Sequence, residues 1–353
     1  MPDIYSIIPP LLEWYRREGR PLPWREEATP YHVWISEIML QQTRIEAAIP
    51  YYYRFLEALP DVRALAAVDD DLLMKLWEGL GYYSRARNLK KAAIRIVEDH
   101  GGELPADVEA LRALPGIGDY TAGAIASIAF GLPAPAVDGN VLRVLSRLFA
   151  DRRDILSEKV KREAIATLAP AYPRIPGDAS ALTQALMELG EVLCIPNGKP
   201  HCKACPLADL CEACKQNITE ELPFRSPRPE RTVEERTLLL LIAGDCVALT
   251  RRPPHGLLAE MWEFPALEGH LKEEEVRSHL AALGIRPAAL ERGPAAKHVF
   301  THREWRMRTF IVTLDSPQGN YTYATAKELD RDYALPTAFR TPLATVRERL
   351  SIL

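Results

Sequence analysis

Two patterns of hydrophobic positions divide the chain. From residue 4 to about residue 192, apolar residues recur every three or four positions, and Pro, Gly and Asp interrupt the pattern. From residue 236 the pattern changes to short apolar runs that are typical of strands. We therefore predict an all-α part followed by an α+β domain, with no strand in the first half. The expected helices cover 4–18, 30–43, 51–59, 70–79, 84–98, 108–114, 120–130 and 141–150, and the later strands cover 237–243, 246–252, 298–302, 305–314 and 320–324, with one helix near 272–283.

A proline-rich, charged segment separates the two parts. Residues 222–235 (LPFRSPRPERTVEE) contain little that a core could bury, so we place a linker there. The expected domains are an all-α domain at 1–221 and an α+β domain at 236–353.

Composition narrows the class of protein. Lys and Arg number 44 against 48 Asp and Glu, and the net charge of -4 argues against a general electrostatic attraction to nucleic acid, so any DNA contact has to come from local patches. No apolar run approaches the roughly 20 residues that span a bilayer. The start, MPDIYSIIPP, lacks the basic segment of a secretion signal. We expect a cytoplasmic, monomeric protein without membrane contact.

One expected helix carries a carboxylate among apolar residues. Thr29 is a suitable N-cap and Pro30 a suitable first residue for this helix, whereas the preceding residues 22–25 (LPWR) read as an extended segment. Apolar residues surround most of the helix, and Glu37 lies in its middle. A buried carboxylate is costly unless it is paired or neutral. Two interpretations stay open: Glu37 shares a narrow wet stripe with Gln41, or it has a catalytic role.

A glycine-built turn joins two of the expected helices. Gly116 and Gly118 interrupt the apolar pattern, which resumes at Tyr120. Glycines leave the amide groups ahead of the second helix free to face an anion such as a DNA phosphate, although an ordinary helical hairpin would show the same residues. Asp138 follows at the entrance of the next helix, where it is either an N-cap or a functional carboxylate. A glycine hairpin, a buried Glu and such an Asp are the parts of an enzyme that cleaves glycosidic bonds in nucleic acid.

Five of the six cysteines lie within 21 positions, which in a reducing compartment indicates metal binding. Zinc and an iron-sulfur cluster both stay open, because tetrahedral thiolate sets suit either one. Zinc would take Cys202, Cys205, Cys211 and Cys214, and a four-iron cluster would take Cys194, Cys202, Cys205 and Cys211.

Five separated motifs occur in the order in which one enzyme family carries them. They are SEIMLQQT, WEGLGYYSRARNL, LPGIGDYTAGAI, VDGNVLRVLSRL and the cysteine group. Through them the chain, from about Leu22 to Cys211, resembles the MutY family of adenine DNA glycosylases, within the helix-hairpin-helix superfamily. The resemblance implies two all-α lobes: a helical barrel at about 26–132 that carries the hairpin, and a cluster lobe formed by 1–25 and 133–221. The family spaces its first two cysteines by six residues, and here seven separate them, with Pro196, Asn197 and Gly198 available to form a turn.

The resemblance also implies the reaction and its residues. The family's members hydrolyse the N-glycosidic bond of adenine mispaired with 8-oxoguanine or guanine in double-stranded DNA, as monofunctional enzymes of base excision repair. Glu37 matches the general acid and Asp138 the transition-state carboxylate, and Tyr120 stands where the related endonuclease III enzymes place a nucleophilic lysine. The further matches are Asn140 as support for the carboxylates, Trp24, Arg25 and Glu188 as walls of the adenine pocket, Gln42 and Tyr82 as wedges into the duplex, and the ligands of a [4Fe-4S] cluster at Cys194, Cys202, Cys205 and Cys211.

The last third of the chain resembles a Nudix domain, as MutY proteins carry at this place. Its helix lacks the glutamates that hold magnesium in a Nudix hydrolase, so we expect no hydrolysis. Phe300, Thr301 and His302 stand where the family has a Phe-Ser-His loop that contacts 8-oxoguanine. Two alternatives to an adenine glycosylase stay open: an endonuclease III-like glycosylase with lyase activity, which Tyr120 argues against because it has no amine for a Schiff base, and a DNA-damage-binding protein without catalysis.

Overall fold

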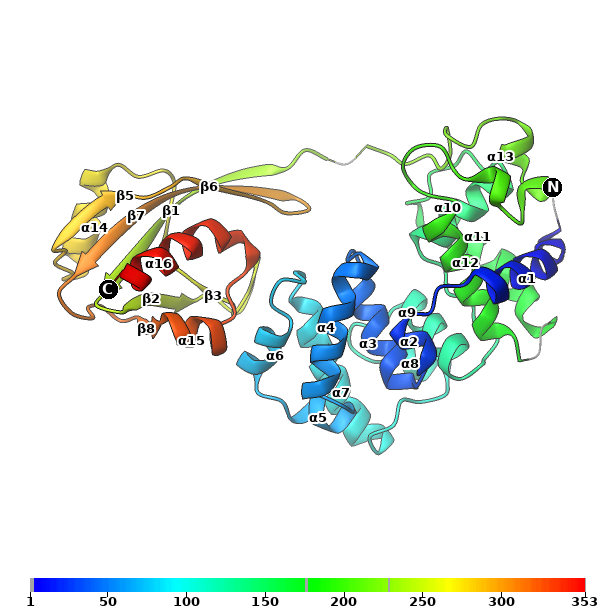
Figure 1. Cartoon of the computed structure of the whole chain (residues 1–353), viewed down its shortest axis with the longest axis horizontal. Coiled ribbons are helices and arrows are strands. Elements are labelled where there is room, and N and C mark those ends of the chain that lie inside the picture. Colours follow the sequence, from blue (N-terminus) through cyan, green and yellow to red (C-terminus); the bar gives the residue numbers. More distant parts are fainter. Residues whose placement is uncertain (1–2, 175–176, 228, 353) are drawn as a thin grey trace. The chain divides into compact units, whose positions relative to one another are not determined.

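A computed structural model describes residues 3–174, 177–227 and 229–352, the side chains of 173, 174 and 352 excepted. The chain forms two compact units: residues 1–67 with 87–227, and residues 68–86 with 228–353. The first is helical and the second is built on a sheet (Figure 1). The sequence had placed one helical domain at 1–221, and its domain boundaries stay a prediction.

Helices account for all regular structure in the described residues of the first unit. Their bounds are η1 Ile4–Ile7, α1 Ile8–Glu18, α2 Pro23–Glu26, α3 Pro30–Leu40, α4 Ile45–Ala58, α5 Val62–Ala67, α7 Ser84–His100 (whose first turn belongs to the second unit), α8 Val108–Arg112, α9 Asp119–Ala124, the π-helix η2 Ile125–Ala129, α10 Gly139–Leu148, α11 Glu158–Leu168, η3 Ala169–Arg174, α12 Ala179–Val192, η4 Cys202–Ala204, η5 Ala208–Leu210 and α13 Glu212–Lys215.

Two sequence-based expectations about local structure in this unit need correction. Residues 22–25 are not extended: Leu22 is, but Pro23 then begins the one-turn helix α2, because its fixed φ angle suits a first helical position. The helix expected over 120–130 is α9 followed by one π-helical turn, in which the Ser127 hydroxyl donates a hydrogen bond to the Gly123 carbonyl, 2.7 Å away. The expected cap was correct, since the Thr29 hydroxyl accepts a hydrogen bond from the amide of His32.

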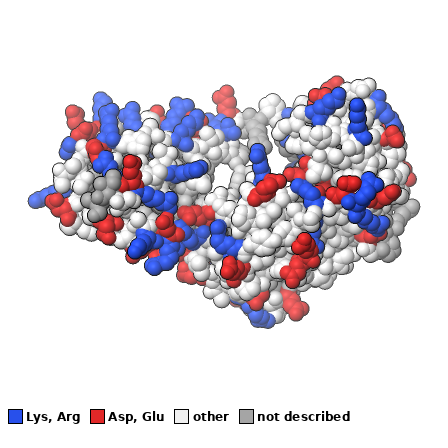
Figure 2. Space-filling view, in the orientation of Figure 1, with Lys and Arg blue, Asp and Glu red and all other residues white. Residues whose placement is uncertain are grey.

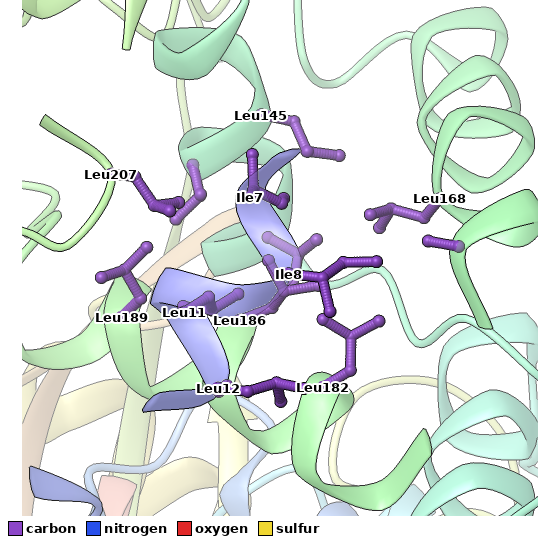
Figure 3. Packing of buried hydrophobic residues seen from close by; sticks show 14 of the residues in the cluster. Ile7, Ile8, Leu11, Leu12, Leu145, Leu168, Leu182, Leu186, Leu189 and Leu207 are labelled. Carbon is purple, nitrogen blue, oxygen red and sulfur yellow. The ribbon is translucent and has the colours of Figure 1, made fainter. Parts of the chain in front are cut away.

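A buried cluster joins the N-terminal helix to the helices that follow the hairpin. Ile7, Ile8, Leu11 and Leu12 of η1 and α1 insert between α10, α12 and the loop at Leu207 (Figure 3). The apolar spacing of α1 places these side chains on one face, so that the N-terminal segment closes the core formed by residues more than 130 positions away. The cluster packs against Cys194, Cys205 and Cys211, and thus ties the cysteine loop to the helices that carry the catalytic candidates.

The second unit is a mixed sheet with helices on both faces. Strand β1 (Thr232–Ala243) pairs in parallel with β7 (Arg303–Leu314) along its whole length, and the other pairings are antiparallel. Alternate residues of β1 enter two cores: Leu238, Leu240 and Ile242 face α15 (Ala326–Arg331) and α16 (Arg340–Ile352), while Leu239 and Leu241 face α14 (Glu273–Ala282). The remaining elements are α6 Asp70–Leu76, β2 Cys246–Arg251, β3 Trp262–Glu263, β4 Ala266–Glu268, β5 Ala289–Arg292, β6 Ala296–Val299, β8 Thr322–Thr325 and η6 Thr337–Phe339.

The sequence pattern found β1, β2, β7 and the short β8, and it missed β3, β4 and β5. The strand expected over 298–302 was wrongly placed, because β6 ends at Val299 and residues 300–302 form the turn that follows. Strands β3, β4 and β5 are two to four residues long, which is too short for an alternating pattern to show. Strand β1 begins at Thr232, inside the segment interpreted as a linker, because pairing with β7 extends it beyond its apolar run.

Acidic and basic side chains are interspersed over the face of the molecule shown in Figure 2. This distribution agrees with the nearly balanced composition. No helix in the described part of the chain is long and apolar enough to cross a membrane.

Candidate active site

Helices α3 and α9 bring a carboxylic acid and a phenol together. Glu37 is buried on α3 with 6% of its surface exposed, and it lines a cavity together with Gln41, so it does not lie on an exposed face of the helix. The Tyr120 hydroxyl, on the first turn of α9, donates a hydrogen bond to Glu37 Oε2 at 2.5 Å. Burial raises the pKa of Tyr120 well above its ordinary value, which keeps the phenol protonated and able to donate.

Asp138 reaches the same cavity from the start of α10. It is the N-cap of this helix, and its Oδ1 accepts a hydrogen bond from the amide of Val141 at 2.8 Å. The N-cap interpretation is thus confirmed, and the same carboxylate also lines the cavity, where its functional role stays a prediction. The neighbouring Asn140 is held by Arg143, whose guanidinium donates to Asn140 Oδ1 at 2.8 Å.

The two carboxyl groups differ in their environment. Burial raises the pKa of Glu37 to about 7, helped by the nearby Asp138 charge and opposed by the Tyr120 hydrogen bond. Burial also raises the pKa of Asp138, although the amides of Val141 and Asn140 and the Arg143 guanidinium all favour its anion. The upward direction at Asp138 differs from the sequence argument, which counted the helix amides and not the burial. A pKa of about 7 lets Glu37 carry a proton near neutral pH.

A cavity of about 790 Å³ opens next to these residues, large enough for a nucleobase and its sugar. It brings together most of the site residues predicted for the helical part of the chain. Those that line it are Trp24, Arg25, Glu37, Gln42, Tyr120, Asp138, Asn140 and Glu188.

One wall of this cavity is an ion-pair cluster of Glu188 with two arginines, of which the resemblance had named Glu188 and Arg25 as wall residues but no ion pair. Glu188 of α12 is 1% exposed, and its two carboxylate oxygens accept hydrogen bonds from Arg20 Nε at 2.5 Å and Arg25 Nη2 at 2.8 Å. Burial raises the pKa of Glu188, but the two guanidinium groups outweigh it, and the net shift is downward. Glu188 is thus a fixed anion. Arg20 was missed, because it lies in a polar turn and its partner is 168 positions away.

An aromatic residue and a strained residue complete the lining. Trp24 is 6% exposed and is held edge-on by the Tyr52 ring, at a centroid distance of 5.4 Å. Gln42 is exposed just after α3 and has a φ angle of 60°, which is uncommon for a residue with a side chain. Such strain persists where the surrounding structure holds a side chain in a required direction.

The glycine turn lies outside this cavity. Gly116 has a φ angle of 77°, and a Cβ atom there would come within 2.7 Å of Asn88 Cβ, so glycine is required twice over. Gly118 is the N-cap of α9, and the space where its Cβ would stand is open. The turn therefore leaves its backbone accessible on the surface ahead of α9.

The cysteines converge on one small pocket. Cys194, Cys202, Cys205, Cys211 and Cys214 line a space of about 30 Å³ whose other walls are mostly apolar. Among the described residues, no three His, Cys, Asp or Glu side chains are grouped so that they could hold one metal ion. The thiolate-forming donors in an apolar pocket nevertheless suit an iron-sulfur cluster, whose iron atoms are each bound by a separate cysteine.

Two buried arginines, also missed from the sequence, fix the first cysteine of this group. Arg147 Nη1 donates to Cys194 Sγ at 3.2 Å and to the Ile195 carbonyl at 3.0 Å. Arg143 Nε donates to the Cys194 carbonyl at 2.7 Å, and its Nη2 donates to the Gly190 carbonyl at 2.7 Å. These two arginines lie on the apolar helix α10, where the sequence offered no partner for them.

The remaining predicted residues lie in the second unit. Phe300, Thr301 and His302 form the turn between β6 and β7, and Phe300 packs against Trp305 with ring centroids 4.9 Å apart. Tyr82 has a φ angle of 47° and is 44% exposed. Its hydroxyl and the Thr301 hydroxyl share a hydrogen bond of 2.8 Å. The structure thus joins a predicted wedge residue to the predicted base-reading turn.

Comparison with known proteins identifies two domain families in the chain. Residues 35–170 match the family described as HhH-GPD superfamily base excision DNA repair protein, and residues 237–345 match the NUDIX domain family. The adenine DNA glycosylase of Mus musculus is 36% identical over 375 residues, which span 89% of this chain and 72% of the mouse protein.

The chain belongs to the adenine DNA glycosylase family. Another member, from Buchnera aphidicola subsp. Acyrthosiphon pisum, is 37% identical over 308 residues, which span 86% of this chain and 85% of that protein. Among solved structures, a thermostable thymine-DNA glycosylase matches 61% of this chain and 97% of its own, with 26% identity and a TM-score of 0.54. The protein is thus a DNA glycosylase of base excision repair.

For an adenine DNA glycosylase of this family, residue 120 bears on the type of reaction. A glycosylase that also cuts the strand through a Schiff base needs an amine at the reacting sugar. Tyr120 offers a phenol instead, and that phenol is committed to Glu37. The described residues that line the cavity include a lysine only at Lys161, on α11.

Proposed function

We propose that this enzyme removes adenine paired with 8-oxoguanine, or with guanine, from double-stranded DNA by hydrolysing the N-glycosidic bond, and that it leaves the strand intact. The observation that carries the proposal is the Glu37 carboxyl group, buried, bonded to Tyr120 and set in one cavity with Asp138. The name adenine DNA glycosylase, shared by the relatives, supports adenine as the base.

In the proposed reaction the two carboxyl groups have different tasks. Adenine is a poor leaving group as an anion, so a protonated Glu37 donates to the base, at N7, as the bond to the sugar stretches. Ionised Asp138 stabilises the positive charge that develops on the sugar. Glu37, having lost its proton, then accepts one from the attacking water. Tyr120 fixes the Glu37 carboxyl group and keeps it oriented toward the base.

The cavity wall gives the extruded base its binding site. Trp24 offers an aromatic surface, and the Glu188 carboxylate with Arg20 and Arg25 offers a rigid polar edge. Because the ion pair is already formed, little reorganisation is needed when the base enters. Asn140 supports Asp138 through its bond to Arg143, Gln42 enters the duplex beside the extruded base, and the amides of the Gly116 to Gly118 turn contact the DNA backbone.

A duplex with one adenine opposite 8-oxoguanine tests this function. Pure enzyme should release adenine and leave a site that breaks only after alkali. Strand breaks without alkali would instead support the endonuclease III-like lyase. Tight binding without base release on long incubation would support a damage-binding protein.

We propose that Cys194, Cys202, Cys205 and Cys211 hold a [4Fe-4S] cluster. Two observations support this proposal: the four cysteines line one pocket, and Arg147 donates a hydrogen bond to Cys194 Sγ. When bound, the cluster would link the four cysteines and so hold the loop after α12 in one conformation. Cys214 shares the pocket but lies outside the set.

Anaerobically purified protein should therefore contain about four iron atoms and absorb visible light. Cys194→Ser should lose most of the iron, and the matched change Cys214→Ser should keep it. A colourless wild-type protein with one zinc, or iron loss in Cys214→Ser alone, would contradict this ligand set.

We propose that the second unit reads the base opposite adenine through the turn of Phe300, Thr301 and His302. This turn is bonded to Tyr82, so the wedge and the reading turn act on the same base pair. In this proposal residues 236–353 form the domain that recognises 8-oxoguanine, and the helical domain cleaves the bond. We propose that the protein acts as a monomer in the cytoplasm, where the reducing conditions keep cysteines free to bind a cluster.

Removing the Thr301 hydroxyl should weaken the preference for 8-oxoguanine over guanine. Thr301→Val keeps the side-chain volume and should lose about one hydrogen bond, roughly a three- to tenfold loss of preference. Thr301→Ser keeps the hydroxyl and should behave as wild type. The measurement is the ratio of adenine release rates on the two mispairs. An equal loss on both, or no change in Thr301→Val, would remove Thr301 from base reading.

A further inference from the structure

A chain of three buried hydroxyl groups runs between the elements that carry the active site. Tyr172 OH and Thr183 Oγ1 are 2.8 Å apart, Thr183 Oγ1 and Ser127 Oγ are 2.8 Å apart, and Ser127 Oγ and the Gly123 carbonyl are 2.7 Å apart. These three side chains are at most 1% exposed. The backbone of Ala136 also lies beside Tyr172 OH, where it lowers the pKa of this hydroxyl group against the larger upward effect of burial.

The direction of donation along this chain is fixed by its Gly123 end. The Gly123 carbonyl can only accept, and each hydroxyl has one hydrogen to donate. Ser127 therefore donates to Gly123, Thr183 to Ser127, and Tyr172 to Thr183. Each hydroxyl donates one hydrogen bond within the chain, so the loss of any member leaves a buried group without its partner.

The chain joins the elements that position the catalytic groups. Gly123 follows Tyr120 by three residues on α9, and Ala136 precedes Asp138 by two. Thr183, at the centre, lies on α12, which also carries Glu188. The Thr183 hydroxyl thus connects three segments of the site. They are the helix with Tyr120, the segment before Asp138 and the helix with Glu188.

The backbones at this seam are in direct contact. A Cβ atom at Gly123 would lie 2.3 Å from the Pro135 carbonyl oxygen, so only glycine lets α9 pack on the segment that leads to Asp138. The π-helical turn that contains Ser127 begins directly after α9. Because close-packed interiors transmit strain, a small displacement at this contact would move Tyr120 and Asp138 relative to each other.

We propose that this hydroxyl chain, with Thr183 as its central positioning residue, sets the spacing between the Tyr120–Glu37 pair and Asp138. The inference rests on the catalytic roles proposed above for these residues. None of the three residues that carry these hydroxyls lines the cavity. Their effect is on the barrier to bond cleavage, because misplacement of catalytic groups by about 1 Å can cost on the order of 100-fold in rate.

The test compares variants of the full-length enzyme in single-turnover assays of adenine release. Thr183→Val, which keeps the shape and loses the hydroxyl, should slow release about tenfold or more while duplex binding changes less than about twofold. Thr183→Ser keeps the hydroxyl and should restore most of the rate. Thr167→Val is the matched control, since Thr167 is exposed on α11 and its hydroxyl donates a hydrogen bond to the Glu163 carbonyl of the same helix.

A second readout separates positioning from a general loss of stability. The Asp138 charge helps raise the pKa of Glu37, so a change in their separation should move the midpoint of the pH–rate profile in Thr183→Val. Partial unfolding would lower the amplitude and leave the midpoint in place. If Thr183→Val does not fold, Tyr172→Phe, which removes only the first hydroxyl, is judged by the same two readouts.

The proposal would be overturned if folded Thr183→Val released adenine at the wild-type rate with the wild-type pH midpoint. It would also be overturned if Thr183→Ser and Thr167→Val lost as much activity as Thr183→Val. Wild-type enzyme is assayed beside the variants. If it releases no adenine, the proposed function fails, whereas a fully active wild type with an equally active Thr183→Val refutes the positioning role alone.

Discussion

Glu37→Gln should bind a duplex with adenine opposite 8-oxoguanine as wild type does and release almost no adenine. An amide can neither donate a proton to the leaving base nor take one from water, and loss of general acid catalysis typically costs about 100- to 10,000-fold. The measurement is single-turnover adenine release beside equilibrium binding. Glu13→Gln, on the exposed face of α1, is the matched control and should keep full activity.

The same variant carries an internal check on its fold. The carboxyl group has a pKa of about 7 in the folded protein against 4.5 as an ordinary value, so its contribution to stability is fully present below pH 4.5 and is lost as the pH rises through 7. The loss is on the order of 3 kcal/mol. Glu37→Gln should not show this loss of stability, because its amide does not ionise, and it should be more stable than wild type at pH 8. Near-normal adenine release by this folded variant would return Glu37 to a structural role.

Asp138→Asn should be slowed by roughly 30- to 1000-fold, which corresponds to about 2–4 kcal/mol of transition-state stabilisation. The change keeps the helix cap, because asparagine caps as well as aspartate, and it removes only the charge that we propose stabilises the sugar cation. Stability should therefore stay close to that of wild type. Chemical denaturation and single-turnover release together separate the two roles of this residue.

Asp107→Asn provides the control for Asp138→Asn. Asp107 caps α8 by accepting a hydrogen bond from the amide of Ala110 at 2.8 Å, and it lies outside the cavity. It should lose neither stability nor activity. If Asp138→Asn behaves in the same way, the carboxylate is a helix cap and nothing more.

Local signals in the sequence were enough to place the catalytic elements. Thr29 and Pro30 fixed the start of the helix that buries Glu37, and Asp138 marked the start of α10. Each of these signals acts within four residues, where capping chemistry is specific. The resemblance to a known family then supplied the roles, and the structure brought eight of the named residues to one cavity.

What the sequence did not show depends on partners far apart along the chain. Nothing near Arg20 indicates that it pairs with Glu188, and nothing near Thr183 indicates that it links Tyr172 to Ser127. The burial of Asp138 that raises its pKa comes from packing and not from its neighbours in sequence. Such contacts are fixed only when the helices pack together.

The pH dependence of adenine release by the wild-type enzyme, under single turnover and with saturating enzyme, tests the central claim most directly. If Glu37 acts as a neutral acid, the rate falls as the pH rises, with a midpoint near the pKa of about 7. The account predicts this fall between pH 6 and pH 8. A rate that rises or stays level over the same range would contradict it.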